Sequence, residues 1–220
     1  MIVALAIAIL LGFLFYASYS IKSQVYVRAL CRVKTQEKVV YLTFDDAPDA
    51  VQTPKVLDVL KRNGIKAAFF CIGGRVAGCE SIVKRIADDG HLIGNHSYSH
   101  KNTFPILSRR TMIADIERCQ SELKRATGAD TPFFRPPFGV TNPRVAYAVR
   151  KLNLKVIGWS IRTYDTNQPP IEKVLRRIRR QLKNGSIILL HDGISGSETL
   201  LQAVIDTIKS EGYSFGELKF

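Results

Sequence analysis

Two neighbouring aspartates and a pair of closely spaced histidines are the residues of this sequence best suited to chemistry. Asp45 and Asp46 end an apolar run, and His96 and His100 lie in the segment Asn-His-Ser-Tyr-Ser-His. Two imidazoles and one carboxylate, with positions open for water, are typical of a catalytic site for zinc or a similar ion. The i,i+4 spacing predicts that both imidazoles lie on one side of a helical turn. His91 opens an apolar run and is expected to be structural.

Asp45 and Asp46 need different roles, because successive side chains of a strand point to opposite sides. At a strand end the chain can turn so that one carboxylate binds the metal while its neighbour faces a water. A carboxylate within hydrogen-bond reach of that water can accept its proton. His191, at the end of another apolar run, can deliver a proton to a leaving nitrogen. Together these residues predict hydrolysis of an amide.

The elements that must position these residues alternate between strand and helix. Apolar runs begin at Val39, Ala67, His91, Phe133, Lys155 and Ser186, and a last strand covers Tyr213–Leu218. Helical patterns cover Thr53–Asn63, Glu80–Asp89, Ser108–Thr127, Pro143–Leu152, Ile171–Lys183 and Glu198–Glu211. This α/β alternation predicts a parallel sheet covered by helices. Seven strands fit a distorted (β/α) barrel or an open doubly wound sheet, and chemistry at successive strand ends suits a barrel mouth.

The N-terminal segment contains no charged side chain from residue 2 to residue 18. That length is near the ~18–20 residues needed to cross a bilayer, so a retained single-pass anchor is favoured over a cleaved signal. We expect a membrane anchor (or uncleaved signal) over residues 1–21, a basic linker over 22–37 and a catalytic domain over 38–220. Basic residues follow the anchor at Lys22, Arg28, Arg32 and Lys34. The positive-inside rule alone would therefore place the domain in the cytoplasm.

The net charge of +13 favours anionic partners. The densest basic run, residues 176–180, lies in an amphipathic helical pattern and is interpreted as a solvated helix face rather than a nucleic-acid site. No nucleic-acid partner and no obligate protein partner is evident. None of the cysteines forms a C-x-x-C pair, so a structural zinc site is not expected. Cys119 is expected in the core, and a disulfide between Cys71 and Cys79 stays open.

Five segments, in order, resemble the motifs of the polysaccharide deacetylases with a NodB-homology domain. They are Thr43-Phe44-Asp45-Asp46-Ala47-Pro48, His96-Ser97-Tyr98-Ser99-His100, Arg135-Pro136-Pro137-Phe138-Gly139, Trp159-Ser160-Ile161-Arg162-Thr163-Tyr164-Asp165-Thr166 and Leu189-Leu190-His191-Asp192. The resemblance covers about residues 38–217 and implies a distorted seven-stranded (β/α) barrel.

The resemblance also implies a role for each matching residue. Asp46, His96 and His100 would bind a divalent metal, zinc first, with cobalt and nickel as alternatives. Asp45 would be the general base, held ionised by Arg135, and His191 the general acid, placed by Asp165. Substrate would meet the segment Pro137, Phe138 and Gly139, where a backbone N–H near Phe138 joins the metal at the oxyanion, and the acetyl methyl would meet Trp159 and Leu189.

Three positions depart from the family's pattern. Ala47 replaces a glycine and would be strained if that residue needed a positive φ. Arg162 stands where the family has an earlier aspartate, and Thr166 where it has a tryptophan. These changes leave the expected catalytic set intact and put the preferred glycan in question.

The sequence therefore predicts a metal-dependent hydrolase that removes N-acetyl groups from an N-acetylglucosamine-containing polysaccharide. The substrate would be cell-wall glycan, a chitin-like chain or a glycolipid. The domain would then lie outside the cytoplasm, on a membrane anchor. Two alternatives stay open: an acetyl-ester deacetylase of xylan-like chains, and a non-catalytic module that binds envelope glycans. If the flanking charges instead place the domain in the cytoplasm, the remaining alternative is an enzyme that acts on a lipid-linked glycan precursor.

Overall fold

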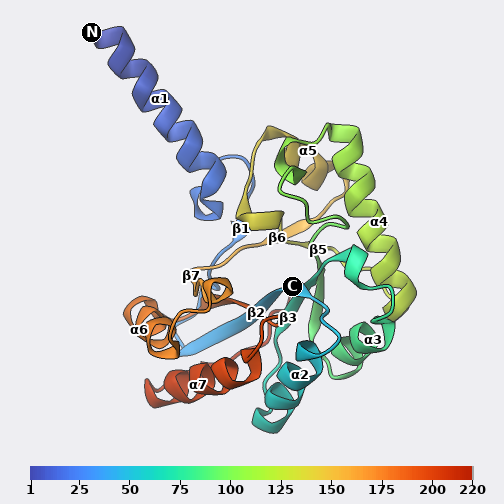
Figure 1. Ribbon diagram of the computed structural model, residues 1–220. Helices are drawn as coiled ribbons and strands as arrows, with labels where there is room; N and C mark the ends of the chain where they lie inside the picture. The colour runs from blue at the N-terminus through green and yellow to red at the C-terminus, as the bar shows by residue number, and fades with distance from the viewer. Residues whose placement is uncertain (220) are drawn as a thin grey trace.

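The computed structural model describes residues 1–219. From residue 39 onward helices and strands alternate along the chain, except for two consecutive strands within residues 155–162 (Figure 1). The α-helices are α1 (Ile2–Tyr19), α2 (Gln52–Asn63), α3 (Glu80–Asp88), α4 (Arg109–Thr127), α5 (Pro143–Lys151), α6 (Ile171–Gln181) and α7 (Ser197–Ser210). The strands are β1 (Ala29–Leu30), β2 (Val39–Ala47), β3 (Ala68–Cys71), β4 (Leu92–Asn95), β5 (Phe133–Phe134), β6 (Lys155–Ile157), β7 (Ile161–Arg162), β8 (Ser186–His191) and β9 (Ser214–Phe215).

The six helices after α1 lie within two residues of the predicted helical patterns, because their apolar periodicity and end signals agree. Ser108 accepts a hydrogen bond from the Thr111 N–H at the start of α4, and Asn142 accepts from two N–H groups at the start of α5. Gly64 and Gly128 end α2 and α4 in the left-handed conformation that glycine adopts without strain.

The sheet is parallel, with the order β1-β6-β5-β4-β3-β2-β8-β7 and β9 paired to β2. The prediction of seven strands was wrong in number, since nine strands join the sheet in residues 1–219. The run that starts at Lys155 divides into β6 and β7, which lie near opposite ends of the strand order, and β1 was not expected. The predicted α/β class and parallel sheet are confirmed, and the sheet forms a half-barrel.

The segment expected to be a basic linker, residues 22–37, is built into the domain. Its strand β1 pairs with β6, and Arg32 then forms an antiparallel bridge with Ser186 at the start of β8. The Val33 N–H donates to the Gly185 carbonyl at 2.9 Å. This segment therefore links β6, near one end of the strand order, to β8, near the other end.

Alternate side chains of the strands enter two apolar clusters. One cluster packs the sheet against α2, α3, α6 and α7, and it also takes in Cys119 and Leu123 from α4. The other packs the opposite face against α4 and α5, and it includes Phe70, Trp159 and Leu189. All four cysteines are free, so Cys71 and Cys79 are not bridged.

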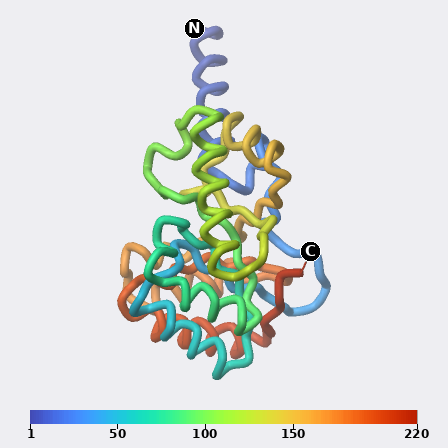
Figure 2. The backbone as a smooth tube through the Cα atoms, turned by 90° about the vertical axis from the view of Figure 1, so that its right-hand side faces the viewer, coloured from blue at the N-terminus to red at the C-terminus, as the bar shows by residue number. Residues whose placement is uncertain are grey.

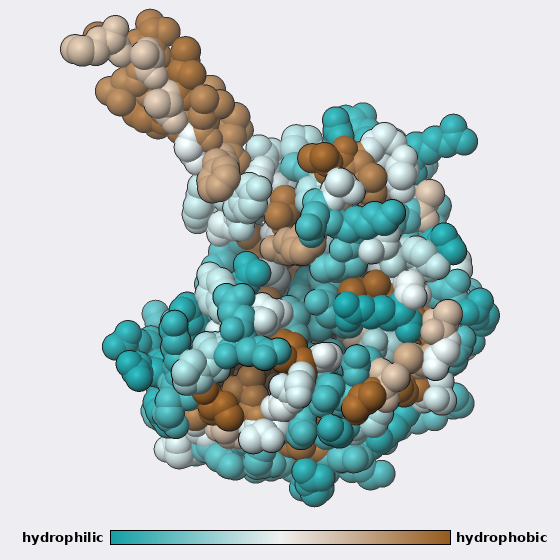
Figure 3. Space-filling model, viewed as in Figure 1, coloured by the Kyte–Doolittle hydropathy of each residue, from teal (hydrophilic) through white to brown (hydrophobic). Residues whose placement is uncertain are grey.

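Helix α1 projects away from the domain as an apolar rod (Figures 2 and 3). It is long and apolar enough to cross a membrane by length and composition, and its 18 residues span about 27 Å. Only its C-terminal end meets the domain. There Ala17 is buried, and the Thr141 N–H donates to the Ser18 carbonyl at 2.9 Å.

Candidate metal centre and active site

The end of β2 presents both aspartates to the same region, although they are neighbours in sequence. The pairing of β2 with β3 shifts register between Asp45 and Ala47, and Asp46 at the shift has a φ of 71°. This irregularity cancels the alternation that would otherwise send the two carboxylates to opposite faces. Ala47 itself does not have a positive φ. The strain considered for an alanine there is therefore absent, because the aspartate before it takes the unusual conformation.

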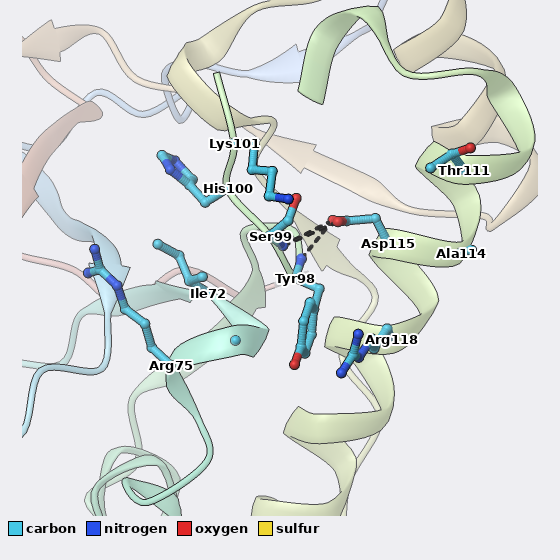
Figure 4. Close-up of a pocket in the computed structure, with 11 residues that line it drawn as sticks. Ile72, Arg75, Tyr98, Ser99, His100, Lys101, Thr111, Ala114, Asp115 and Arg118 are labelled. Carbon is cyan, nitrogen blue, oxygen red and sulfur yellow. Dashed lines mark hydrogen bonds between the residues drawn. The ribbon is translucent and has the colours of Figure 1, made fainter. Parts of the chain in front are cut away.

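The two histidines approach each other from a loop and not from a helical turn, so that part of the prediction was wrong. Within this loop Ser97 and His100 have positive φ values of 69° and 44°. The imidazole rings of His96 and His100 lie 4.7 Å apart between their centroids. The loop is shaped by a carboxylate on α4. Asp115 accepts from the Tyr98 N–H at 2.8 Å and from the Ser99 N–H, as the dashed lines in Figure 4 show.

Asp46, His96 and His100 form a group of three potential metal ligands. Their ligand atoms all lie within 4.8 Å of one another. Asp46 Oδ1 is 3.6 Å from His96 Nε2 and 3.4 Å from His100 Nε2. This oxygen is buried and has no hydrogen-bond partner, which is costly unless a cation occupies the space beside it. The donor set therefore fits a divalent cation.

The protonation of the three groups also suits a cation. His96 Nδ1 lies 2.7 Å from the Arg135 carbonyl oxygen, so it carries the proton and leaves the Nε2 lone pair directed at Asp46. Burial, and then the neighbouring His96, lower the pKa of His100 to about 4, so that ring is neutral at neutral pH. Burial raises the pKa of Asp46, but the electrostatic effect of the His96, His100 and His191 side chains and of Arg75 outweighs burial and leaves that pKa below its ordinary value.

Asp45 is held by a fully buried guanidinium. Arg135 Nη1 donates to Asp45 Oδ1 at 2.6 Å and to Thr43 Oγ1 at 2.9 Å. Its Nε and Nη2 donate to the carbonyls of Ile157 and Gly158 at 2.9 and 2.8 Å. These bonds occupy one oxygen of Asp45 and leave Oδ2 facing the metal group, 3.7 Å from His96 Nε2.

His191 is placed beside Asp45 by strand register and is oriented by Asp165. The pairing of β2 with β8 puts Asp45 opposite His191. Asp165 Oδ1 lies 2.8 Å from His191 Nδ1, and Oδ2 accepts from the His191 N–H at 2.7 Å. Burial lowers the pKa of His191, but the hydrogen bond and charge of Asp165 outweigh it and raise that pKa above its ordinary value. An imidazolium is thus stabilised at this position.

The residues expected to meet substrate lie around the same centre but differ in exposure. Phe138 is 37% exposed, and its ring centroid lies 4.8 Å from that of His100. Pro137, Gly139, Trp159 and Leu189 are buried. Gly139 has a φ of 71°, and a Cβ there would come within 2.3 Å of the Trp159 ring, so this contact requires glycine.

Two cavities adjoin the centre. One of about 680 Å³ lies beside His100 and is lined by the basic side chains of Arg75, Lys101 and Arg118 (Figure 4). Another of about 310 Å³ lies beside His191 and Asp165. The centre therefore has room for a ligand on each side.

Comparison with known proteins agrees with this geometry. The chain matches the family described as polysaccharide deacetylase over residues 32–157. It belongs to that family. It is 35% identical over 181 residues to a peptidoglycan-N-acetylglucosamine deacetylase of Bacillus cereus, covering 80% of this chain and 65% of that protein. It is 34% identical over 178 residues to a chitooligosaccharide deacetylase of Sinorhizobium fredii, covering 79% of this chain and 80% of that one.

A solved structure shares the fold closely. The crystal structure of a carbohydrate esterase family 4 pseudoenzyme from Bacillus anthracis is similar with a TM-score of 0.79 at 28% identity. The match covers 86% of this chain and 66% of that one. Because this chain spans 65% of the length of its Bacillus cereus relative, the activity of the whole relative is not transferred with the fold.

Sequence reasoning missed the residues that hold the reactive groups in place. Asp115 shapes the histidine loop from α4, and the single hydroxyl proton of Thr163 is shared between Asp165 Oδ1 at 2.9 Å and the Leu189 carbonyl oxygen at 2.7 Å. Asp192, fully buried beside Thr53, has its pKa raised by burial to about 7. A single acidic or hydroxyl residue on a helix or strand gives no signal of such a role until the fold is known.

Proposed function

We propose that this protein is a metal-dependent hydrolase that removes N-acetyl groups from an N-acetylglucosamine-containing polysaccharide. The observation that carries the proposal is the buried, unpartnered Oδ1 of Asp46 between two imidazole nitrogens, beside a guanidinium-held carboxylate and a carboxylate-held imidazole. Those are the parts that amide hydrolysis needs: a cation site, a base and an acid.

The metal would be held by Asp46, His96 and His100, and two nitrogens with one oxygen suit zinc, with cobalt or nickel as substitutes. When bound, such an ion acidifies water and polarises a carbonyl oxygen. The His96 ring is fixed in the productive tautomer by the Arg135 carbonyl. The assignment of zinc rests on the ligand atoms that these three side chains provide.

The protein's proton carriers flank that cation site. Asp45 Oδ2 takes a proton from the attacking water, while Arg135 keeps Oδ1 fixed. His191, held protonated by Asp165, gives its Nε2 proton to the nitrogen as the carbon–nitrogen bond breaks. The water oxygen joins the acyl carbon, so the products are acetate and a free amine. Burial of Asp45, Asp165 and Arg135 keeps these groups in one geometry.

The substrate class is proposed from the relatives and the charge of the cleft. The relatives named above act on peptidoglycan or on chitooligosaccharides. The larger cavity is lined by Arg75, Lys101 and Arg118 and by one acidic residue, Asp115. Its excess of positive charge favours a glycan that carries negative charge, as cell-wall glycan does. Helix α1 would anchor the domain at the outer face of the membrane, next to such a glycan.

The test is acetate release by the full chain in a neutral detergent. The full chain is used because Ala17 and Ile21, near the end of α1, are buried in the domain. Cell-wall glycan, chitin oligomers and acetylated xylan are offered with zinc or cobalt, or with a chelator. Asp45→Asn is compared with Asp206→Asn, a matched change at an exposed carboxylate on α7.

We expect release from an N-acetylated glycan that needs metal and is lost in Asp45→Asn by about 10²–10⁴-fold, the usual contribution of a general base. Asp206→Asn should retain full activity. Release of acetate only from acetylated xylan would show that the protein hydrolyses acetyl esters and not N-acetyl amides. Metal-loaded, folded protein that releases no acetate from any of the three would support the binding-module alternative.

A further inference from the structure

A third cavity lies at the foot of α1, where the apolar helix meets the domain. It measures about 230 Å³ and is lined by Tyr19 at the end of α1 and the three residues that follow it, Ser20, Ile21 and Lys22. The domain contributes Trp159, Arg162, Tyr164, Arg177 and Gln181. Three of these nine residues are cationic and none is acidic. The cavity therefore favours an anion.

The cations of this cavity are ordered without being neutralised. Arg162 and Arg177 stand over the ring of Tyr164 at 5.0 and 4.6 Å from its centroid, and Arg162 also stands 5.7 Å from that of Trp159. Lys22 Nζ donates one hydrogen bond, to the Ser160 carbonyl at 2.6 Å. Within residues 1–219, none of the three cations is in an ion pair. Aromatic contacts fix a guanidinium but leave its charge and its N–H donors for a ligand.

The position of the cavity places it at a membrane surface and beside the reactive centre. Tyr19 is the last residue of α1, so the cavity lies where an apolar span would leave the bilayer. Tyr164 immediately precedes Asp165, the partner of His191. Thr141 lies two residues after Gly139, which ends the segment expected to meet substrate, and its N–H donates to the Ser18 carbonyl of α1. The base of the anchor and the mouth of the half-barrel are therefore neighbours.

We propose that this cavity binds the anionic phosphate of a membrane phospholipid, through Lys22, Arg162 and Arg177. Planar guanidinium groups bind phosphate through paired N–H···O bonds, and anionic lipid headgroups concentrate phosphate at the level of a juxtamembrane cavity. The inference rests on α1 being the membrane anchor proposed above, and it does not depend on the deacetylase activity. Bound lipid would hold the mouth against the membrane surface.

Trp159 is the single tryptophan of the chain and lines the cavity, so its fluorescence reports binding. The full chain in a neutral maltoside detergent is titrated with phosphatidylglycerol, with phosphatidylcholine and with soluble glycerol phosphate. The double variant Arg162→Gln/Arg177→Gln is compared with Arg176→Gln/Arg180→Gln, which removes the same charge from exposed positions on α6 outside the cavity. Circular dichroism checks folding, and Lys22→Gln serves as a second variant if the double variant does not fold.

We expect a saturable change with phosphatidylglycerol, and a half-saturating lipid fraction raised about tenfold or more in the cavity variant but less than about twofold in the control. An equal response to phosphatidylcholine would overturn the proposal, since that headgroup has no net charge. An equal loss in both double variants would reduce the effect to general surface charge and also overturn it. Saturation by glycerol phosphate alone at the same concentrations would make the ligand a soluble phosphate and not a lipid. Acetate release is not measured, so failure of the proposed reaction leaves each outcome readable.

Discussion

Removing the guanidinium of Arg135 should cost far more stability than a typical substitution. The side chains of Arg135 and Asp45 are 0% and 6% exposed, and their closest contact is 2.6 Å. Arg135→Met leaves a buried carboxylate without its counter-charge and leaves the Ile157 and Gly158 carbonyls without their side-chain donors. Breaking a buried pair by removing one partner costs about 3–5 kcal/mol, whereas replacing both partners costs much less.

The assay is a double-mutant cycle in urea, with chelator present so that metal binding does not contribute. We expect Arg135→Met to lower the free energy of unfolding by about 3–5 kcal/mol. Asp45→Asn/Arg135→Met should be more stable than the sum of the single changes predicts by about 0.5–3 kcal/mol, the range of coupling between residues in contact. Arg135→Lys, which keeps the charge, serves if Arg135→Met does not fold. Additive effects, with coupling below about 0.5 kcal/mol, would refute the pairing on which the assignment of Asp45 as base rests.

Four further outcomes are expected. Asp165→Asn removes the group that raises the pKa of His191; since a general acid must be protonated, activity should be lost at lower pH than in the native protein as pH rises, which a profile of kcat against pH would show. Chelation should abolish acetate release and added cobalt restore it, measured with metal content; release that survives complete metal removal would contradict the metal centre. Gly139→Ala should destabilise by about 1–3 kcal/mol more than Gly128→Ala in urea, because both glycines have positive φ but only the first would press a Cβ against the tryptophan ring. Ala47→Gly should lower the free energy of unfolding in urea by about 0.5–1 kcal/mol, because glycine loses more conformational freedom on folding and Ala47 has no positive φ that glycine would relieve. An increase in stability would show that Ala47 is strained.

The helices and the gathering of polar groups at one mouth could be predicted because they depend on local pattern. Apolar periodicity and caps fix α2 to α7, and parallel strands bring their carboxyl ends together. The division into β6 and β7 could not be predicted, because a single apolar run gives no sign that three residues, 158–160, cross between distant strands. The conformation of the histidine loop depends on Asp115, a tertiary partner that spacing alone does not reveal.

The fold also bears on whether the basic residues that follow α1 indicate the orientation of the protein in a membrane. Lys22 binds the Ser160 carbonyl and Arg32 lies in the bridge to β8, so these residues belong to the folded domain and not to a flexible loop. Charge bias orients a span through short loops, and folded domains translocate largely regardless of it. The basic residues after α1 are therefore weak grounds for a cytoplasmic domain. Because the base of α1 contacts Thr141 beside the mouth, a membrane through α1 would hold that mouth close to its surface on whichever side the domain lies. A glycan next to the membrane is then the substrate that this arrangement favours.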